Sequence, residues 1–148
     1  MNTDLVMTGE ERNAYILRLD DELLLGGVIL SEWCTLITQQ ADIAFEAGAD
    51  LAALLIAVSG IETHLRSESS SDQSVRLHRL IDDSGMSDPL KKDLHAMRRY
   101  RNRWVHVDEP WQDEELLSNP ERTLNELESM STLAMRLLRT VLYTNPWV

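Results

Sequence analysis

The sequence predicts an all-α protein, an antiparallel bundle of four to five helices. Leu, Ala and Glu are abundant among the 148 residues, aromatic residues make up 5%, and this composition favours helices. Apolar residues recur at alternating steps of three and four along several segments, and short connections with capping signals separate these segments. A chain of this length, 43% hydrophobic, can bury a core as a single domain.

The N-terminal segment 1–27 is expected to be an arm whose structure the pattern does not decide. In "AYILRLDDELLLGG", residues 14–27, the apolar runs are short and two glycines close them, so a strand, a short helix and an extended arm all remain open. Residues 28–148 are expected to form the helical bundle.

The first two helices of the bundle are expected over residues 31–47 and 51–66. Gly48 follows the first helix, where glycine commonly ends helices. Asp50 is expected to cap the second helix, because its carboxylate can accept a hydrogen bond from a free backbone N–H. The expected apolar face of the first helix consists of Trp33, Ile37, Ala41 and Ala44.

The later helices are marked by capping residues that are followed by proline. A short helix is expected around residues 73–83, and "SDP" then predicts a helix over about 89–106. "SNPER" repeats this signal with Asn119 as the cap, and "NP" at 145–146 ends the last helix. The expected apolar face of the last helix consists of Leu124, Leu127, Ser131, Ala134, Leu138 and Val141.

The charge and the cysteine content limit the classes of function. A net charge of −11 argues against non-specific coating of nucleic acid and against binding to anionic membranes, but it allows a local basic site. The single cysteine, Cys34, cannot form an internal disulfide, and this suggests a reducing compartment. Cys34 is expected to lie in the core. No signal peptide and no apolar run of membrane-spanning length are recognised, so a cytoplasmic protein is expected.

Two opposite charges interrupt two apolar stripes. Glu62 follows Leu51, Leu55 and Val58 at helical spacing, and Arg101 follows Leu90, Leu94 and Met97 at the same spacing. An unpaired buried charge costs roughly several kcal/mol, so Glu62 and Arg101 are expected to be partners across a helix pair. Two readings remain open, a buried ion pair that fixes the helix register and a functional site.

The surroundings of Arg101 favour the functional site. Arg98, Asn102 and His106 recur every four residues and therefore lie on one helix face beside Arg101. Imidazole, with an unperturbed pKa of about 6.5, suits proton transfer, and guanidinium groups match phosphate oxygens. These groups predict cleavage of a phosphodiester without a metal. Further candidates for binding the substrate are Arg99, Arg103, Lys91 and Lys92.

The other histidines give weaker signals. His64, His78 and His95 lie on separate predicted helices, with no pair at a spacing that indicates zinc. They are expected to be surface residues.

The motif "RNRWVH", residues 101–106, resembles the signature of the HEPN superfamily, in which an arginine precedes a histidine by four to six residues and Asn often follows the arginine. The segment "LKKDLHAMRRYRNRWVHV" resembles the helix that carries this motif. "AALLIAVSGIETHLR", residues 52–66, resembles the earlier helix that supplies an acidic partner, which would be Glu62. The resemblance covers roughly residues 30–145 in helix order, and only the six-residue motif is specific.

The resemblance implies a HEPN-like bundle that dimerises and acts as a metal-independent endoribonuclease, in a toxin–antitoxin or another defence system. It implies that His106 is the general acid or base in attack by the 2′-hydroxyl, that Arg101 stabilises the transition state, and that Asn102 and Glu62 orient the pair. The expected partners are RNA, a second copy of the chain, and an antitoxin or a nucleotidyltransferase. No membrane, cofactor or metal is expected.

Inactive HEPN members, which bind a nucleotide or a protein, provide the alternative. Carboxylates follow His106 in "DEP" and "WQDEE" and would repel RNA unless they face away. An enzyme requires Arg101 and His106 in an open cleft, whereas an inactive bundle would leave His106 covered or bound to a carboxylate such as Asp108.

The placement of charge predicts a homodimer. Residues 91–103 hold six Lys or Arg and one Asp, whereas residues 107–128 hold eight acids and one Arg. One helix presents a narrow basic strip, and two strips at a two-fold axis would form a basic cleft that contains both copies of His106.

Overall fold

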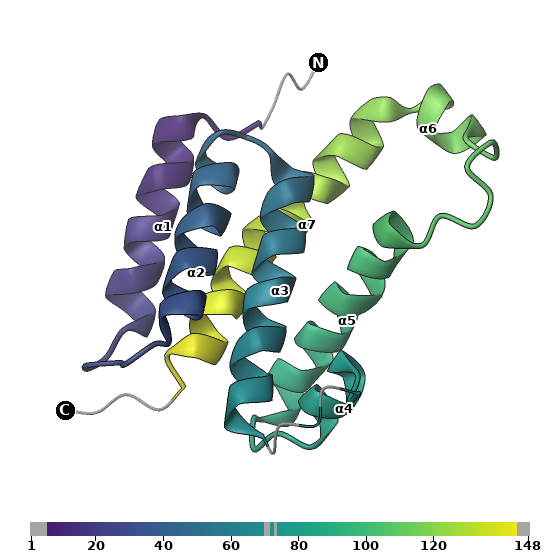
Figure 1. Cartoon of the computed structure of the whole chain (residues 1–148). Coiled ribbons are helices and arrows are strands. Elements are labelled where there is room, and N and C mark those ends of the chain that lie inside the picture. Colours follow the sequence, from purple (N-terminus) through teal and green to yellow (C-terminus); the bar gives the residue numbers. More distant parts are fainter. Residues whose placement is uncertain (1–5, 70–71, 73, 145–148) are drawn as a thin grey trace.

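The computed structural model describes residues 6–69, 72 and 74–144 and shows a helical bundle in this part of the chain (Figure 1). The predicted all-α class is confirmed. The described residues form seven helices, which are α1 (Gly9–Leu23), α2 (Glu32–Glu46), α3 (Asp50–Glu68), α4 (Leu77–Asp82), α5 (Asp88–Val105), α6 (Glu114–Ser118) and α7 (Pro120–Leu142).

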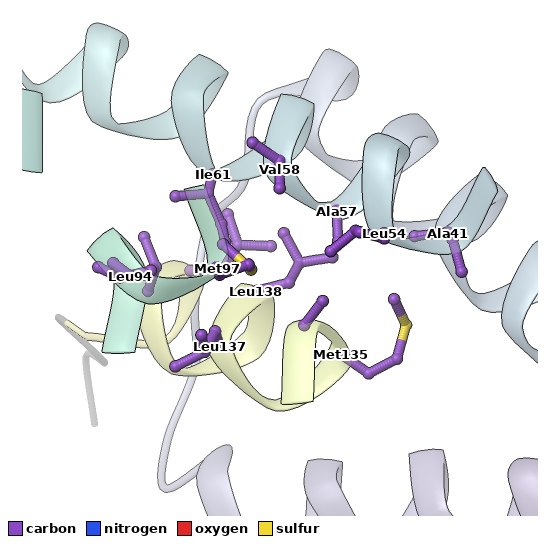
Figure 2. Close-up of a cluster of buried hydrophobic side chains, with 14 of the residues drawn as sticks. Ala41, Leu54, Ala57, Val58, Ile61, Leu94, Met97, Met135, Leu137 and Leu138 are labelled. Atoms are coloured by element: carbon purple, nitrogen blue, oxygen red, sulfur yellow. The ribbon is translucent and has the colours of Figure 1, made fainter. Parts of the chain in front are cut away.

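Helix α3 is the central element, and it packs mainly against α2 and α7. Small residues on α3 let its neighbours approach closely. A Cβ atom on Gly60 would lie 3.0 Å from Leu138 Cδ1 and 3.1 Å from Ile37 Cγ2. Figure 2 shows the side chains of α2, α3, α5 and α7 that meet in the core, among them Ala41, Leu54, Ala57, Ile61, Leu94, Met97, Met135 and Leu138.

The N-terminal segment contains a full helix of the bundle. Helix α1 begins after Thr8, whose hydroxyl accepts a hydrogen bond from the backbone N–H of Glu11. Its residues Ile16 and Leu19 are buried, and the helix packs against α2 and α7. Of the three alternatives for residues 14–27, the helix is therefore the one observed, as far as Leu23.

Two buried arginines join α1 to the rest of the bundle. Arg12 is 1% exposed, and its guanidinium donates to the carboxylate of Asp50 at 2.6 and 3.2 Å and to the carbonyl of Phe45 at 2.9 Å. Arg139, on α7, donates to Asp20 at 2.8 Å and to Asp42 at 2.7 and 3.0 Å. Each cation is thus satisfied by carboxylates from other helices, which burial requires.

The predicted bounds of the main helices agree closely with the structure. The helices expected over 31–47, 51–66 and 89–106 are observed as α2, α3 and α5. Gly48 ends α2 with a φ of 79°, and the side chain of Asn119 caps α7 by accepting from the N–H of Arg122 at 3.2 Å. Both capping predictions are confirmed.

Several predicted details differ from the structure. The Asp50 carboxylate does not cap α3, because it accepts hydrogen bonds from Arg12 and from the Ser131 hydroxyl. The predicted apolar faces include two exposed residues, Trp33 (71%) and Leu124 (62%). The short helix begins only at Leu77, and helix α6 was not predicted. The stop expected at 145–146 lies outside the described residues.

The two ends of the bundle differ. Helices α4 and α5 cover the C-terminal half of α3, whereas the C-terminal end of α5 and the first turns of α7 extend toward α6, away from α1 and α2 (Figure 1). Among residues 6–69, 72 and 74–144, none of the helices combines the length and the apolarity that a membrane crossing requires. The candidate site lies where α3, α4 and α5 meet.

Candidate functional site

An open pocket of about 470 Å³ lies between α3, α4 and α5. It brings together Arg101, Asn102 and His106, the residues of the sequence motif, and it also includes Glu62 from α3. The volume falls within the range of small-molecule sites, roughly 300–1,000 Å³. The complete lining consists of Glu62, Arg76, Leu77, His78, Arg98, Arg101, Asn102 and His106.

Helix α5 positions the motif through its amphipathic sequence. The helix begins after Ser87, whose hydroxyl accepts from the N–H of Leu90, and Leu94 and Met97 anchor it in the core. Arg101 is the next residue of this stripe and is only half-buried, so the stripe leads from the core to the pocket. His106 is the C-terminal cap, and its ring lies one turn beyond Asn102 at the helix end.

The guanidinium of Arg101 is oriented by its neighbour. Arg101 Nε donates a hydrogen bond to Asn102 Oδ1 at 3.0 Å. This contact uses one of the five N–H groups of the guanidinium and leaves the Asn102 amide as a further donor. Both side chains can therefore donate to an anion in the pocket.

Arg98 is held by a chain of polar contacts from α4. Arg98 Nε donates to His95 Nδ1 at 3.4 Å, and His95 Nε2 lies 2.7 Å from Asp82 Oδ1. Because Nδ1 accepts, Nε2 carries the proton that His95 donates to Asp82. Burial and then the nearby charges of Arg99 and Arg101 lower the pKa of Arg98. Positive charge is thus concentrated beside the pocket, and an anion there would relieve this repulsion.

Glu62 pairs within its own helix. Its carboxylate accepts a hydrogen bond from Arg66 Nη2 at 2.7 Å, and not from Arg101 as the sequence suggested. The buried face of α3 is centred on Leu54, Ala57 and Ile61, so Glu62 lies at the edge of this face. The apolar sequence of α3 continues nearly all round the helix, and its periodicity therefore did not identify the buried face.

The other predicted substrate-binding residues lie outside the pocket lining. Arg103 donates to Glu126 on α7 at 2.9 Å and lies 5.4 Å from the ring centroid of Tyr100. Lys91 donates to the backbone carbonyl of Asp82 at 3.0 Å. Arg99 and Lys92 are exposed on α5, and neither lines the pocket. Of the five basic residues predicted to bind substrate, Arg98 alone lines the pocket.

Two polar residues of the pocket were not recognised from the sequence. Arg76 precedes α4 and His78 lies in its first turn, and His78 was expected to be an ordinary surface residue. No spacing relates them to the motif, because they reach it through the packing of α4 against α5. The only sequence signal is the proximity of a basic residue and an imidazole in "RLH" at 76–78.

His106 is accessible from solvent. Within the described part of the chain, no hydrogen bond or ion pair holds its ring, and Asp108 does not bond to it. Asp108 and Glu109 lie in an exposed segment that leads toward α6. The imidazole is therefore free to contact a ligand, as the enzyme hypothesis requires.

The remaining candidates from the sequence lie outside the lining of this pocket. Cys34 is buried on α2, as expected. Among the described residues, no three His, Cys, Asp or Glu side chains converge as a group that could hold a metal ion.

No protein-family model, curated protein or solved structure matches the chain.

Proposed function

We propose that this protein is an endoribonuclease that cleaves RNA without a metal ion. The observation that carries the proposal is the lining of the pocket. Arg76, Arg98 and Arg101 surround the space into which His78 and His106 also open, and Asn102 adds an amide. Guanidinium groups bind phosphate oxygens, and imidazoles transfer protons near neutral pH. Cleavage of a phosphodiester uses both kinds of group, guanidinium to bind the phosphate and imidazole to transfer protons.

The reaction is a transfer of the phosphoryl group within the RNA. His106 takes the proton of a 2′-hydroxyl, whose oxygen then attacks the neighbouring phosphorus. Arg101 balances the negative charge of the transition state, and its hydrogen bond to Asn102 holds the guanidinium in place. The products are a 2′,3′-cyclic phosphate and a 5′-hydroxyl, and the leaving 5′ oxygen must receive a proton.

The resemblance to HEPN proteins supports this proposal, because their motif corresponds to Arg101, Asn102 and His106, which line one pocket with Glu62. A role in a toxin–antitoxin or another defence system follows from the same resemblance. An antitoxin or a nucleotidyltransferase would then be a partner.

A homodimer is part of the proposal, and exposed apolar side chains near His106 support it. They occupy the end of α5, the following segment, α6 and the start of α7, and they are Val105, Val107, Trp111, Leu116, Leu117 and Leu124. Large exposed apolar side chains that lie along one segment are typical of protein interfaces. Packing of two copies at this end would bring the two pockets toward a common axis.

An inactive bundle that binds a nucleotide is the second candidate. The segment that follows His106 is acidic, and Asp108 and Glu109 are exposed. This charge opposes a long polyanion more than it opposes a mononucleotide held in one pocket. The pocket volume of about 470 Å³ allows such a ligand.

The experiment is an incubation of the purified chain with an RNA oligonucleotide in the presence of EDTA. The wild type is expected to produce cyclic-phosphate ends, and His106→Ala is expected to lose this activity, whereas the control His64→Gln retains it. Binding of a nucleotide without cleavage would support the inactive bundle. Full activity of His106→Ala would exclude His106 from the reaction.

A further inference from the structure

His78 and His106 line one pocket from two different elements. His106 ends α5, whereas His78 lies in the first turn of α4. Arg98 and Arg101 line the same space from α5. We infer that His78 is the second catalytic residue of this site, the general acid that protonates the leaving 5′ oxygen of RNA. This inference rests on the proposed ribonuclease function.

Helix α4 is held firmly enough to position a catalytic side chain. Three of its six residues, Leu77, Leu80 and Ile81, are buried. Its C-terminal end is tied to α5, because the Asp82 carbonyl accepts from Lys91 at 3.0 Å and the Asp82 carboxylate lies 2.7 Å from His95. The first turn of α4 lies farther along α5, where it lines the pocket with Arg98 and Arg101. His78 therefore faces the pocket from a packed helix and not from a loop.

The chemistry requires two proton transfers at two places. In an in-line displacement, the attacking 2′ oxygen and the leaving 5′ oxygen lie on opposite sides of the phosphorus. One imidazole contacts only one of these oxygens directly, so a second group has to reach the other. His78 comes from α4 and His106 from the end of α5, with guanidinium groups of the same pocket available for the non-bridging oxygens.

The step balances without a further reactant. Neutral His106 takes the proton from the 2′-hydroxyl while the 2′ oxygen forms a bond to phosphorus. The bond between phosphorus and the 5′ oxygen breaks, and protonated His78 gives its proton to that oxygen. A 2′,3′-cyclic phosphate and a 5′-hydroxyl result. Each imidazole ends in the opposite protonation state, and exchange with water restores both.

Charged side chains from several elements lie around His78. Asp82 lies four residues later on α4 and therefore on the same face as His78. The hydrogen bond with His95 is the largest effect on the pKa of Asp82 and lowers it, burial opposes this lowering, and nearby positive charge, including that of Lys91, lowers the pKa by a smaller amount. Asp82 does not line the pocket, and the charged residues that line it with His78 are Arg76, Glu62, Arg98 and Arg101.

The decisive experiment compares two substrates with two leaving groups. His78→Gln is expected to lower kcat on RNA by about 100-fold or more, the usual contribution of an acid–base group. On uridine 3′-(4-nitrophenyl phosphate) the loss should be less than roughly fivefold, because 4-nitrophenolate leaves without a proton. The pH profile on RNA should lose its alkaline limb in this variant. His78→Asn is the second variant, His64→Gln is the control, and circular dichroism confirms folding.

The outcomes separate this inference from the proposed function. Wild-type activity in both His78 variants would overturn the inference and leave His106 as the essential group, as would an equal loss on both substrates. Wild-type activity in the His78 variants is the result expected if His106 of the other copy in a dimer supplies the second imidazole. A wild-type protein that leaves RNA intact would overturn both proposals.

Discussion

Arg66 donates a hydrogen bond from Nη2 to the Glu62 carboxylate at 2.7 Å, one turn earlier on α3. Both side chains are partly exposed, and both charges are satisfied within one helix. Among the described residues, the side-chain hydrogen bond of Arg101 goes to Asn102. The guanidinium of Arg101 therefore carries its full charge into the pocket, where it is available to a phosphate.

This pairing predicts a small effect of Glu62 on stability. Glu62→Ala should lower the free energy of unfolding by less than about 1 kcal/mol, since exposed ion pairs at this spacing contribute roughly 0.3–0.5 kcal/mol. Urea denaturation measures the change. In double-mutant cycles, Glu62 should couple more strongly to Arg66 than to Arg101. A loss of roughly 3–5 kcal/mol would instead indicate that Glu62 compensates a buried cation.

The ion pairs that stabilise the fold lie elsewhere. Removing one of them is expected to lower the free energy of unfolding by more than Glu62→Ala does. Asp50→Ala should lower the free energy of unfolding by roughly 3–5 kcal/mol, because it leaves the buried Arg12 with Glu128 at 3.4 Å as its remaining ion-pair partner. Glu22→Ala is the control, since it removes an exposed carboxylate from its pair with Arg136 and should cost less than about 1 kcal/mol. Similar losses in both variants would contradict this assignment.

Local signals in the sequence predicted most of the fold. Gly48 and Asn119 act at helix ends through their own backbone and side chain, so the adjacent residues suffice to identify them. Arg12 and Arg139 could not be recognised as buried, because their carboxylate partners come from other helices. A charged residue in a sequence is expected to be exposed to solvent, and only the tertiary structure shows whether partners of opposite charge surround it.

The sequence predicted only part of the candidate site, because some of its residues come together only through tertiary packing. Arg98, Asn102 and His106 share one helix face, and helical spacing alone places them together. Arg76 and His78 reach the pocket through the packing of α4 against α5, which no spacing in the sequence encodes. The sequence thus predicts one wall of the pocket, and the tertiary structure adds the other.

The half-buried His64 predicts a dependence of stability on pH. Burial lowers the pKa of His64 below its usual value of about 6.5, and the nearby Glu68 opposes this only in part. Below pH 6.5 the unfolded chain therefore binds a proton that the folded chain resists, so stability falls as the pH falls through this window. His64→Gln should weaken the dependence, measured by urea denaturation between about pH 5 and pH 7.5. An unchanged dependence of stability on pH in His64→Gln would contradict this role of His64.

The proposed dimer predicts that one exposed leucine controls the oligomeric state. Leu117, on α6, is 72% exposed, and Leu117→Glu should convert the dimer to a monomer by placing a charge in the apolar interface. Leu25→Glu is the matched control, because Leu25 is 78% exposed in the connection between α1 and α2, far from α6 (Figure 1). Sedimentation velocity measures both variants. A monomeric wild type would refute the dimer.

Two arginines on α5, Arg101 and Arg103, are expected to contribute differently to RNA binding. Arg101 lines the pocket, whereas Arg103 pairs with Glu126 and is two residues, or about 200°, farther round α5. Alanine at either position removes one positive charge, so the change in net charge is the same. If Arg101 contacts a phosphate, only Arg101→Ala removes a released counterion from the binding equilibrium.

The measurement is the affinity for a single-stranded RNA oligonucleotide at several salt concentrations, followed by fluorescence anisotropy. The slope of log K against log salt should become shallower by about 0.7 in Arg101→Ala, the value for one phosphate contact on a single strand. Arg103→Ala should change it much less, because Glu126 already neutralises this side chain. Equal slopes in the two variants would mean that RNA binding depends on the total charge of α5 and not on a contact within the pocket.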